Sequence, residues 1–349
     1  MPENEGRLIL SARDIKTYFP MRRGLFQRVY GYKKAVDGVN FDAYAGETLG
    51  IVGESGCGKS TLGKTLLRLT EPTSGKFLYY AKDKTPVDFF CDVDKRGIFE
   101  YRRKFQMIFQ DPNLSLDPKM TAFKIVEEPL LVHSVFKTKS ETAEFVVTLL
   151  EKVGISSDMI SRYPHEFSGG QKQRIGIARA LALNPEIIVA DEPVSALDVS
   201  VQAQVLNLMQ QLQRELGLTY VFISHNLSVI NHISDRVMVL YMGRVAEFAD
   251  CESFFKKQHH PYSELLKNSI LHFDDDSRRK FTEKADITDK PHLEVPDYSI
   301  VPKNEVENSG NYCFFNPRCP YKTEVCVKLR PELKEISKGR LVACHNYIK

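Results

Sequence analysis

The hydrophobic pattern of this chain is dominated by short apolar runs that suit strands better than helices. The most apolar runs, which are typical of buried strands, lie at 48–52, 105–109, 187–192 and 220–223. Weaker alternation marks 8–19, which predicts an early strand of an antiparallel sheet, and strands are also expected at 39–44 and 75–80. Two further runs, 237–241 and 244–248, flank Met242 and Gly243, which predict a hairpin turn. The polar stretch 82–104 is expected to be a connection or a hairpin.

Helical periodicity fills much of the chain between these runs. Leu62, Leu66 and Leu69 recur at helical spacing, and residues 199–216 carry one apolar face. Residues 121–162 and 172–183 are also expected to be helical. Strands and helices together predict an α/β fold, in which residues from about 112 to 183 form a helical subdomain inserted into the core.

A glycine-rich loop follows the strand at 48–52 and precedes a helix. Residues 53–61 match the pattern G-x-x-x-x-G-K-[ST], in which backbone N–H groups and the helix N-terminus cradle phosphates. The predicted nucleotide-binding residues are Gly53, Ser55, Gly56, Cys57, Gly58, Lys59, Ser60 and Thr61. Lys59 is expected to reach the β- and γ-phosphates, and the Ser60 hydroxyl to bind the Mg²⁺ ion that they carry. The alternative is a chance glycine-rich turn, which the flanking strand and helix disfavour.

Two carboxylates, Asp191 and Glu192, end the apolar run at 187–192. One suits the shell of the Mg²⁺ ion, and the second can polarise a water for attack on the γ-phosphate. A purely structural role is less favoured, because burying carboxylates without a cation is unfavourable.

Gln110 and His225 also end strand-like runs. A glutamine in that place can point its amide at a metal or a water, although alone it is more often structural. A lone histidine is also more often structural. His225 ends the third strand aimed at one site, so we expect it to sense the γ-phosphate.

Ser168, Gly170 and Gln171 begin the helix expected at 172–183. A serine and glycines at a helix start can hold a second anion with a hydroxyl and backbone N–H groups. Without other motifs, a plain N-cap is the favoured interpretation.

Composition and charge limit the partners. The 349 residues carry a net charge of +3 from 48 basic and 45 acidic side chains, which gives no indication of nucleic-acid binding. Basic and aromatic residues alternate at 22–34, but such a loop is more often a solvated surface. Tyr30 or Tyr32 in this stretch is a candidate to stack on adenine. The acidic N-terminus lacks the features of a signal peptide, and no apolar segment is long enough to span a bilayer, so we expect a cytoplasmic protein.

Taken in order, these motifs resemble those of ABC transporter ATP-binding subunits over residues 8–268. Residues 53–61 look like the Walker A motif, Gln110 like the Q-loop glutamine, 168–171 like the signature, 187–192 like Walker B, Asp198 like part of the D-loop, and His225 like the switch histidine. Phe167 replaces the leucine that usually begins the signature. The resemblance implies a Mg²⁺-dependent ATPase domain at 1–271, with a RecA-like P-loop NTPase core, an antiparallel β subdomain and the helical insertion. It also implies a head-to-tail dimer in which Ser168 and Gly170 contact the partner's nucleotide.

Within that family, residues 34–39, 53–58 and 110–121 are most similar to the F-type subunits of oligopeptide and dipeptide importers. The resemblance implies a heterodimer with a D-type ATPase subunit, two membrane permease subunits and an extracytoplasmic solute-binding protein. The chain would then lie at the cytoplasmic face of the membrane. Importers of nickel, glutathione and oligosaccharides share the family. A soluble ABC ATPase of DNA repair or translation is less favoured, since neither long heptads nor a second cassette is present. A regulatory protein with a vestigial cassette conflicts with the intact Glu192.

The last part of the chain differs in composition. Residues 272–310 are expected to be a linker or wrapping segment, and a C-terminal region at 311–349 contains Cys313, Cys319, Cys326 and Cys344. Four thiols in a short cytosolic segment favour a metal centre. Their spacings disfavour structural zinc, and the F-type resemblance favours a 4Fe–4S cluster, with Zn²⁺ or plain reduced thiols as alternatives.

Overall fold

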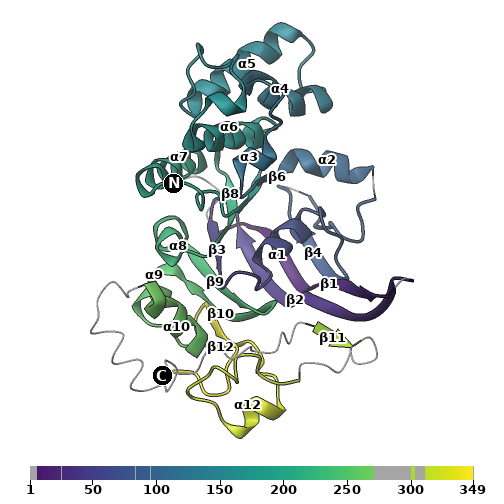
Figure 1. The fold of residues 1–349 in the computed structure, drawn as a ribbon, viewed down its shortest axis with the longest axis vertical. Helices are drawn as coiled ribbons and strands as arrows, with labels where there is room; N and C mark the ends of the chain where they lie inside the picture. The colour runs from purple at the N-terminus through teal and green to yellow at the C-terminus, as the bar shows by residue number, and fades with distance from the viewer. Residues whose placement is uncertain are drawn as a thin grey trace.

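The computed structural model describes residues 6–24, 26–82, 84–94, 96–270, 300–302 and 311–348. An eight-stranded sheet runs through the centre of the molecule (Figure 1), in the order β12-β13-β10-β9-β3-β8-β7-β6. Its strands are β3 (Thr48–Val52), β6 (Phe105–Ile108), β7 (Ile187–Asp191), β8 (Thr219–Ser224), β9 (Arg236–Tyr241), β10 (Arg244–Asp250), β12 (Lys334–Ser337) and β13 (Arg340–Val342). Strands β6, β7, β8, β3 and β9 are parallel neighbours, so their carboxyl ends meet at one edge.

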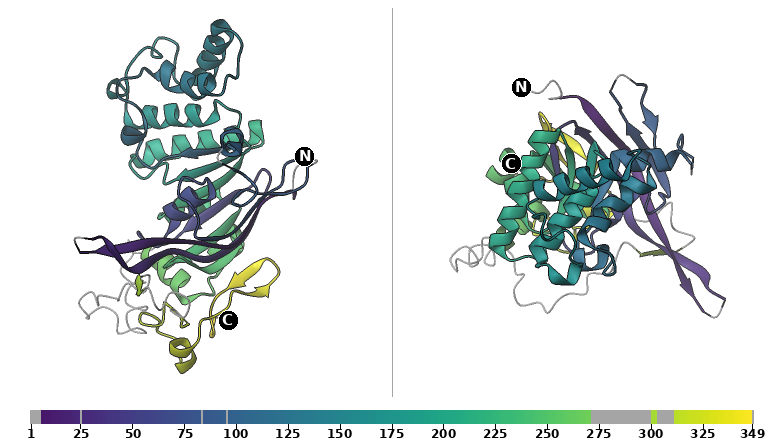
Figure 2. Two further views of the ribbon diagram at one scale, coloured as in Figure 1. Left: turned by 90° about the vertical axis from the view of Figure 1, so that its right-hand side faces the viewer. Right: turned by 90° about the horizontal axis from the view of Figure 1, so that it is seen from above.

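A five-stranded antiparallel sheet packs beside it, in the order β11-β2-β1-β4-β5. Its strands are β1 (Leu8–Arg23), β2 (Arg28–Tyr44), β4 (Ser74–Tyr79), β5 (Val87–Asp88) and β11 (Ile300–Pro302). The hairpin of β1 and β2 is longer than its neighbours and reaches out from the body of the molecule (Figure 2). Both sheets and α1 contribute to one apolar core, which includes Val39, Ile51, Leu62, Phe77 and Val189.

The helices lie mostly either above the large sheet or at its lower left in Figure 1. They are α1 (Lys59–Leu66), α2 (Gly97–Lys104), α3 (Pro112–Ser115), α4 (Ala122–Val132), α5 (Lys139–Lys152), α6 (Gly169–Leu181), α7 (Val199–Leu216), α8 (Leu227–Ile233), α9 (Cys251–Lys256), α10 (Pro261–Ile270) and α12 (Glu324–Lys328), with a 3-10 turn at Pro164–Glu166. Helices α3 to α6 form the upper layer and fall in the stretch where periodicity predicts the helical subdomain.

The stretch 82–104 holds more structure than its sequence indicates. It contains the short strand β5 and the helix α2, whereas the polar composition predicts only a connection or a hairpin. Helix α2 buries a single residue, Ile98, so the apolar periodicity that reveals other helices is missing here. Its basic last turn, Arg102 to Lys104, complements the helix dipole.

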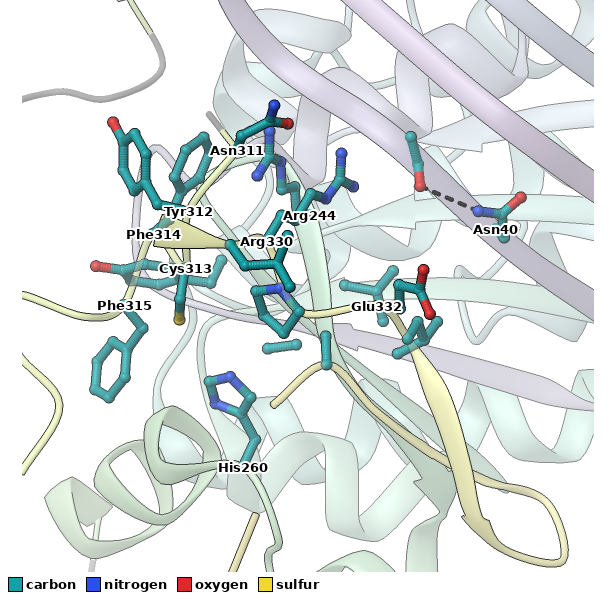
Figure 3. Close-up of a pocket in the computed structure, with 18 residues that line it drawn as sticks. Asn40, Arg244, His260, Asn311, Tyr312, Cys313, Phe314, Phe315, Arg330 and Glu332 are labelled. Atoms are coloured by element: carbon teal, nitrogen blue, oxygen red, sulfur yellow. Dashed lines mark hydrogen bonds between the residues drawn. The ribbon is translucent and has the colours of Figure 1, made fainter. Parts of the chain in front are cut away.

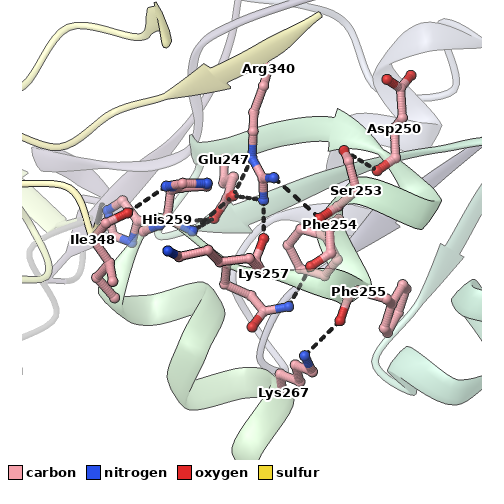
Figure 4. A network of polar contacts seen from close by, with 12 residues as sticks. Glu247, Asp250, Ser253, Phe254, Phe255, Lys257, His259, Lys267, Arg340 and Ile348 are labelled. Carbon is pink, nitrogen blue, oxygen red and sulfur yellow. Dashed lines mark hydrogen bonds and ion pairs between the residues drawn. The ribbon is translucent and has the colours of Figure 1, made fainter. Parts of the chain in front are cut away.

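The C-terminal region is joined to the large sheet. Strand β13 pairs with β10, where Val342 lies opposite Glu247. Beneath this pairing, Arg340 forms an ion pair with Glu247 at 2.8 Å, and both side chains are buried (Figure 4). The Glu247 carboxylate also accepts the backbone N–H groups of His259 and His260. Residues 300–302, inside the predicted linker, pair with β2 at Gly31–Lys33, and the rest of 272–310 lies outside the described residues.

Candidate nucleotide site

The phosphate loop lies between β3 and α1, as its sequence predicts. Gly58 precedes α1 with φ at 107°, and a Cβ there would lie 2.0 Å from the Ala35 carbonyl oxygen. Gly53 is similarly enclosed, since its Cβ would lie 2.2 Å from the Leu240 carbonyl oxygen. Side chains at these positions would displace the loop from the hairpin and from β9. The loop therefore depends on glycine for its shape.

A cavity of about 620 Å³ opens over this loop. It is lined by Phe19, Lys33, Ala35, Ser55, Gly56, Gly58, Lys59, Ser60, Thr61, Gln110, Glu192 and His225. Residues from separate stretches of the chain thus face one space. The sequence predicts all of them to be nucleotide-site residues except Phe19, Lys33 and Ala35. Gly53 and Cys57 belong to the loop but do not line this cavity, and Cys57 is buried.

The cationic and hydroxyl groups of the loop are already held in place. Lys59 is buried and its Nζ donates to the carbonyl oxygens of Gly53 and Glu54, at 2.8 and 2.9 Å. Ser60 Oγ donates to Asp191 Oδ1 at 2.8 Å. Burial raises the pKa of Asp191, while the Ser60 hydroxyl opposes that shift. A buried carboxylate beside a hydroxyl is an oxygen-only donor set of the kind that Mg²⁺ prefers.

Glu192 is the meeting point of the other strand ends. Its Oε2 lies 3.0 Å from His225 Nδ1 and accepts a hydrogen bond from Gln110 Nε2 at 3.1 Å. The Glu192 side chain is 12% exposed, whereas His225 is 55% exposed and borders the cavity. The structure therefore brings together the three side chains that the sequence assigns to catalysis.

The aromatic residue that lines the cavity is Phe19, and neither Tyr30 nor Tyr32 is part of the lining. Phe19 lies on β1 opposite Lys33 of β2, is 40% exposed and lines the cavity. Tyr30 is absent from the lining, and its hydroxyl donates to Met21 Sδ farther out on the hairpin. In the sequence, Tyr30 and Tyr32 lie in the basic stretch 22–34, whereas Phe19 ends the predicted strand before it. Phe19 precedes Pro20, where the apolar alternation ends, and nothing in this local sequence marks it as a residue that binds a ligand.

The second predicted anion site lies apart from this cavity. Ser168 caps α6 through a capping box, in which its Oγ accepts from Gln171 N–H at 3.3 Å and Gln171 Oε1 accepts from Ser168 N–H at 3.0 Å. Ser168, Gly170, Gln171 and the exposed Asp198 are not among the residues that line the cavity. Among the described residues, the start of α6 therefore lies outside the cavity over the phosphate loop.

The four C-terminal cysteines are free thiols that are buried or half-buried. Burial, with smaller contributions from the other thiols, raises the pKa of Cys319 to about 12 and of Cys344 to about 11. Cys313 donates its backbone N–H to the Cys326 carbonyl at 2.9 Å. In the stretches that the structure describes, no three His, Cys, Asp or Glu side chains are placed to hold a metal ion. The predicted metal centre is therefore not supported by this conformation.

Comparisons with known proteins agree with this geometry. Residues 36–195 match the family model described as ABC transporter. The chain is also 47% identical, over 97% of both chains, to the oligopeptide transport ATP-binding protein AppF of Bacillus subtilis. This chain belongs to the ABC transporter ATP-binding family. As a cassette of that family it is an ATPase subunit, and no described helix is long and apolar enough to cross a membrane.

Other relatives of this ABC cassette give the same result. Identity is 45%, over 97% of both chains, with the dipeptide transport ATP-binding protein DppF of Haemophilus influenzae, and 42%, over 96% of this chain and 93% of the relative, with DppF of Escherichia coli. Residues 246–326 match a model for the C-terminal region of oligopeptide/dipeptide transporters. The dimeric post-hydrolysis structure of the cassette MJ0796 bound to ADP and Pi aligns with a TM-score of 0.60 and 29% identity, over 70% of this chain and 99% of that chain.

Proposed function

We propose that this chain is the ATP-hydrolysing subunit of an importer of oligopeptides or dipeptides. The proposal is supported mainly by two features of the same chain. One is the cavity that Glu192 lines, and the other is the match of residues 246–326 to the C-terminal region of oligopeptide/dipeptide transporters. The relatives named for oligopeptide and dipeptide transport align over nearly the whole chain, and so over both features. Oligosaccharides, nickel and glutathione are the alternative cargoes.

In the proposed reaction, the loop N–H groups and Lys59 hold the phosphates of ATP. Lys59 exchanges its bonds to the Gly53 and Glu54 carbonyls for bonds to phosphate oxygens. Ser60, Asp191 and Gln110 would hold Mg²⁺, which when bound neutralises charge on the phosphates. Binding a cation lowers the energy of the ionised Asp191 carboxylate, which burial otherwise raises.

Glu192 then polarises the attacking water, because its carboxylate borders the cavity and is held by two neighbours. Gln110 orients one carboxylate oxygen through its amide. His225 contacts the same oxygen from another strand end and is the exposed member of the group, which suits contact with the γ-phosphate. The three groups thus have separate roles, in which Glu192 polarises water, Gln110 positions the carboxylate and His225 senses the phosphate.

Phe19 is proposed as the ring that stacks on adenine. It borders the same cavity as Lys59 and is exposed enough to offer a face to a base. Stacking needs only a π-face and requires no hydrogen bond from the ring.

Closure of the site is proposed to require a second ATPase subunit. Ser168, Gly170 and Gln171 would contact the nucleotide of the partner, and Asp198 would lie near the same interface. Their separation from the cavity within one chain favours this arrangement, as does the structural similarity to a cassette described as a dimer. A D-type ATPase subunit is the proposed partner. Two permease subunits would anchor the pair at the cytoplasmic face of the membrane, and a solute-binding protein would deliver the cargo.

A 4Fe–4S cluster is proposed for Cys313, Cys319, Cys326 and Cys344. The proposal rests on four thiols within one short C-terminal region of the sequence. Among the described residues, no three potential ligands are arranged to hold a metal ion. Iron and sulfide analysis of protein purified without oxygen tests it. About four of each per chain would support the cluster, zinc would favour a four-cysteine zinc site, and absence of metal would leave reduced thiols.

The proposed cargo is tested by transport. The chain would be reconstituted in vesicles with the permeases, D-type subunit and binding protein encoded beside it. ATP supplied on the side of the ATPase subunits should drive uptake of a labelled peptide, and Lys59→Ala should abolish it. Uptake of a labelled oligosaccharide, nickel or glutathione in place of peptide would contradict the peptide assignment while leaving the ATPase assignment intact.

A further inference from the structure

The C-terminal segment 311–318 packs against the phosphate loop. Arg318 and Glu54, the second residue of the loop, form two parallel hydrogen bonds, Nη1 to Oε2 at 2.8 Å and Nη2 to Oε1 at 2.7 Å. Such bidentate pairs fix orientation as well as charge. The two side chains are 31% and 40% exposed, so solvent only partly screens the pair. A residue 264 positions away in sequence thus holds the loop.

An aromatic cluster supports this pair. The Arg318 guanidinium lies over the rings of Phe315 and Tyr241, at 5.7 and 5.9 Å from their centroids. Phe315 also packs against Tyr262 at 5.5 Å, and the Tyr262 hydroxyl accepts the backbone N–H of Glu54 at 2.8 Å. Figure 3 shows Phe315 next to Cys313 and Phe314 on the same segment, with His260 facing it. Backbone and side chain of Glu54 are therefore both held by one cluster.

The position of Glu54 makes its charge important for nucleotide binding. Lys59, the main cation for the phosphates, donates to the Glu54 carbonyl. Burial and, to a smaller extent, the charge of Glu54 raise the pKa of Cys57. The Glu54 carboxylate therefore affects the electrostatic potential inside the loop. A carboxylate released from Arg318 would compete with phosphate for Lys59 and repel the anionic nucleotide. Held by Arg318, it is neutralised and turned toward the C-terminal segment.

We propose that Arg318 is a positioning residue for ATP binding, which acts by neutralising and orienting Glu54. The C-terminal region thereby becomes part of the nucleotide site and increases its affinity for ATP. The proposal rests on the nucleotide site described above and extends it to a region outside the recognised motifs.

The test is equilibrium binding of a fluorescent ATP analogue to the full chain. Arg318→Gln, which shortens the side chain and removes its charge, should weaken binding about fivefold, the lower end of coupling between sites. Arg318→Lys should restore most of the loss at low salt. In a Glu54→Gln background, adding Arg318→Gln should have no further effect, because the carboxylate that it controls is gone. High salt should reduce the effect of Arg318→Gln.

Lys328→Ala is the matched control, since it removes a C-terminal cation paired with Glu324 and remote from the loop. It should bind like wild type. Equal weakening by Arg318→Gln in both backgrounds, or wild-type affinity in the single variant, would overturn the proposal.

If Arg318→Gln fails to fold, Glu54→Asp is the second variant. It shortens the side chain that pairs with Arg318 and so breaks the pair by a change in the loop. It must weaken binding in the same direction, and unchanged affinity would contradict the role of Arg318. Failure of the wild-type chain to bind nucleotide would instead refute the nucleotide site itself.

Discussion

At the scale of single residues, the site is built from side chains at strand ends. Asp191, Glu192 and His225 follow parallel strands, which bring their carboxyl ends to one edge of the sheet. Short apolar runs that end in polar residues are visible in sequence, and this is why Glu192, His225 and Gln110 can be placed together from sequence alone. The hydrogen bonds that hold Glu192 follow directly from that placement.

Phe19 could not be placed in this way. Its ring reaches the cavity because the β1 and β2 register sets it opposite Lys33, and this register includes several irregular shifts. A strand register of that kind depends on contacts between distant residues and leaves no mark in local periodicity. The sequence therefore points to Tyr30 or Tyr32, which lie nearer to the phosphate loop in sequence.

Phe19→Ala should weaken ATP binding about tenfold, the loss expected for one stacked base, while Phe19→Tyr should retain most of the affinity. Calorimetric titration with ATP measures both. Phe26→Ala removes an aromatic side chain that is 81% exposed farther along the hairpin and serves as the control. A large loss in Tyr30→Ala with none in Phe19→Ala would show that the sequence-based choice is the correct one.

At the scale of elements, β10, β13 and α9 meet around buried charges. Arg340 on β13 pairs with the fully buried Glu247 on β10 and also donates to the Ser253 carbonyl of α9 (Figure 4). Both charges are buried, so each depends on the other. No local pattern signals this pair, because its members are 93 positions apart.

Arg340→Ala should therefore destabilise the protein by about 3 kcal/mol, since it leaves a buried carboxylate without its cation. Denaturant unfolding of the full chain measures the change. Arg13→Ala, which breaks an exposed ion pair with Asp42, should change stability by less than about 1 kcal/mol and provides the comparison. Similar losses in the two variants would mean that burial of the Glu247 pair contributes little.

His260 makes the same region sensitive to acid. Its complete burial lowers the pKa to about 4, so the folded state takes up a proton less readily than the unfolded state. Its contribution to stability is full above the ordinary histidine pKa of about 6.5 and is lost as pH falls from there toward 4. The loss from this group between about pH 7.5 and 5 should approach about 2 kcal/mol.

His260→Asn offers an amide oxygen to the Tyr262 N–H that His260 Nδ1 now accepts. The variant should lose less stability than wild type over the same pH interval. Denaturant unfolding at the two pH values measures the difference, and an equal or larger loss in the variant would exclude His260 as the titrating group.

At the scale of the whole molecule, the sequence predicts the cassette better than it predicts the C-terminal region. The cassette follows its motifs closely, because each motif is local and the strands that carry the site residues, β3, β7 and β8, are short and buried. The C-terminal region does not. Its four cysteines predict a metal-held module, whereas the structure joins it to the core through β13 and through Arg318. Contacts of this kind link residues far apart in the chain, and a single sequence does not contain them.

This arrangement also changes what a C-terminal substitution should do. With an independent module, disorder of residues 311–349 would spare the nucleotide site. With Arg318 bound to Glu54 and Phe315 packed against Tyr262, such disorder should reach the phosphate loop. The C-terminal region of this cassette is therefore best treated as part of its ATP-binding unit.

The role proposed for Glu192, polarising the attacking water, is tested by ATP hydrolysis in the assembled importer. The other ATPase subunit carries the equivalent glutamate-to-glutamine change, so that turnover depends on this site. Glu192→Gln should then lower the rate at least about a hundredfold while ATP still binds, because the shape is kept and the carboxylate is lost. Hydrolysis near the rate of the Glu192 enzyme, with ATP bound equally well, would contradict the account.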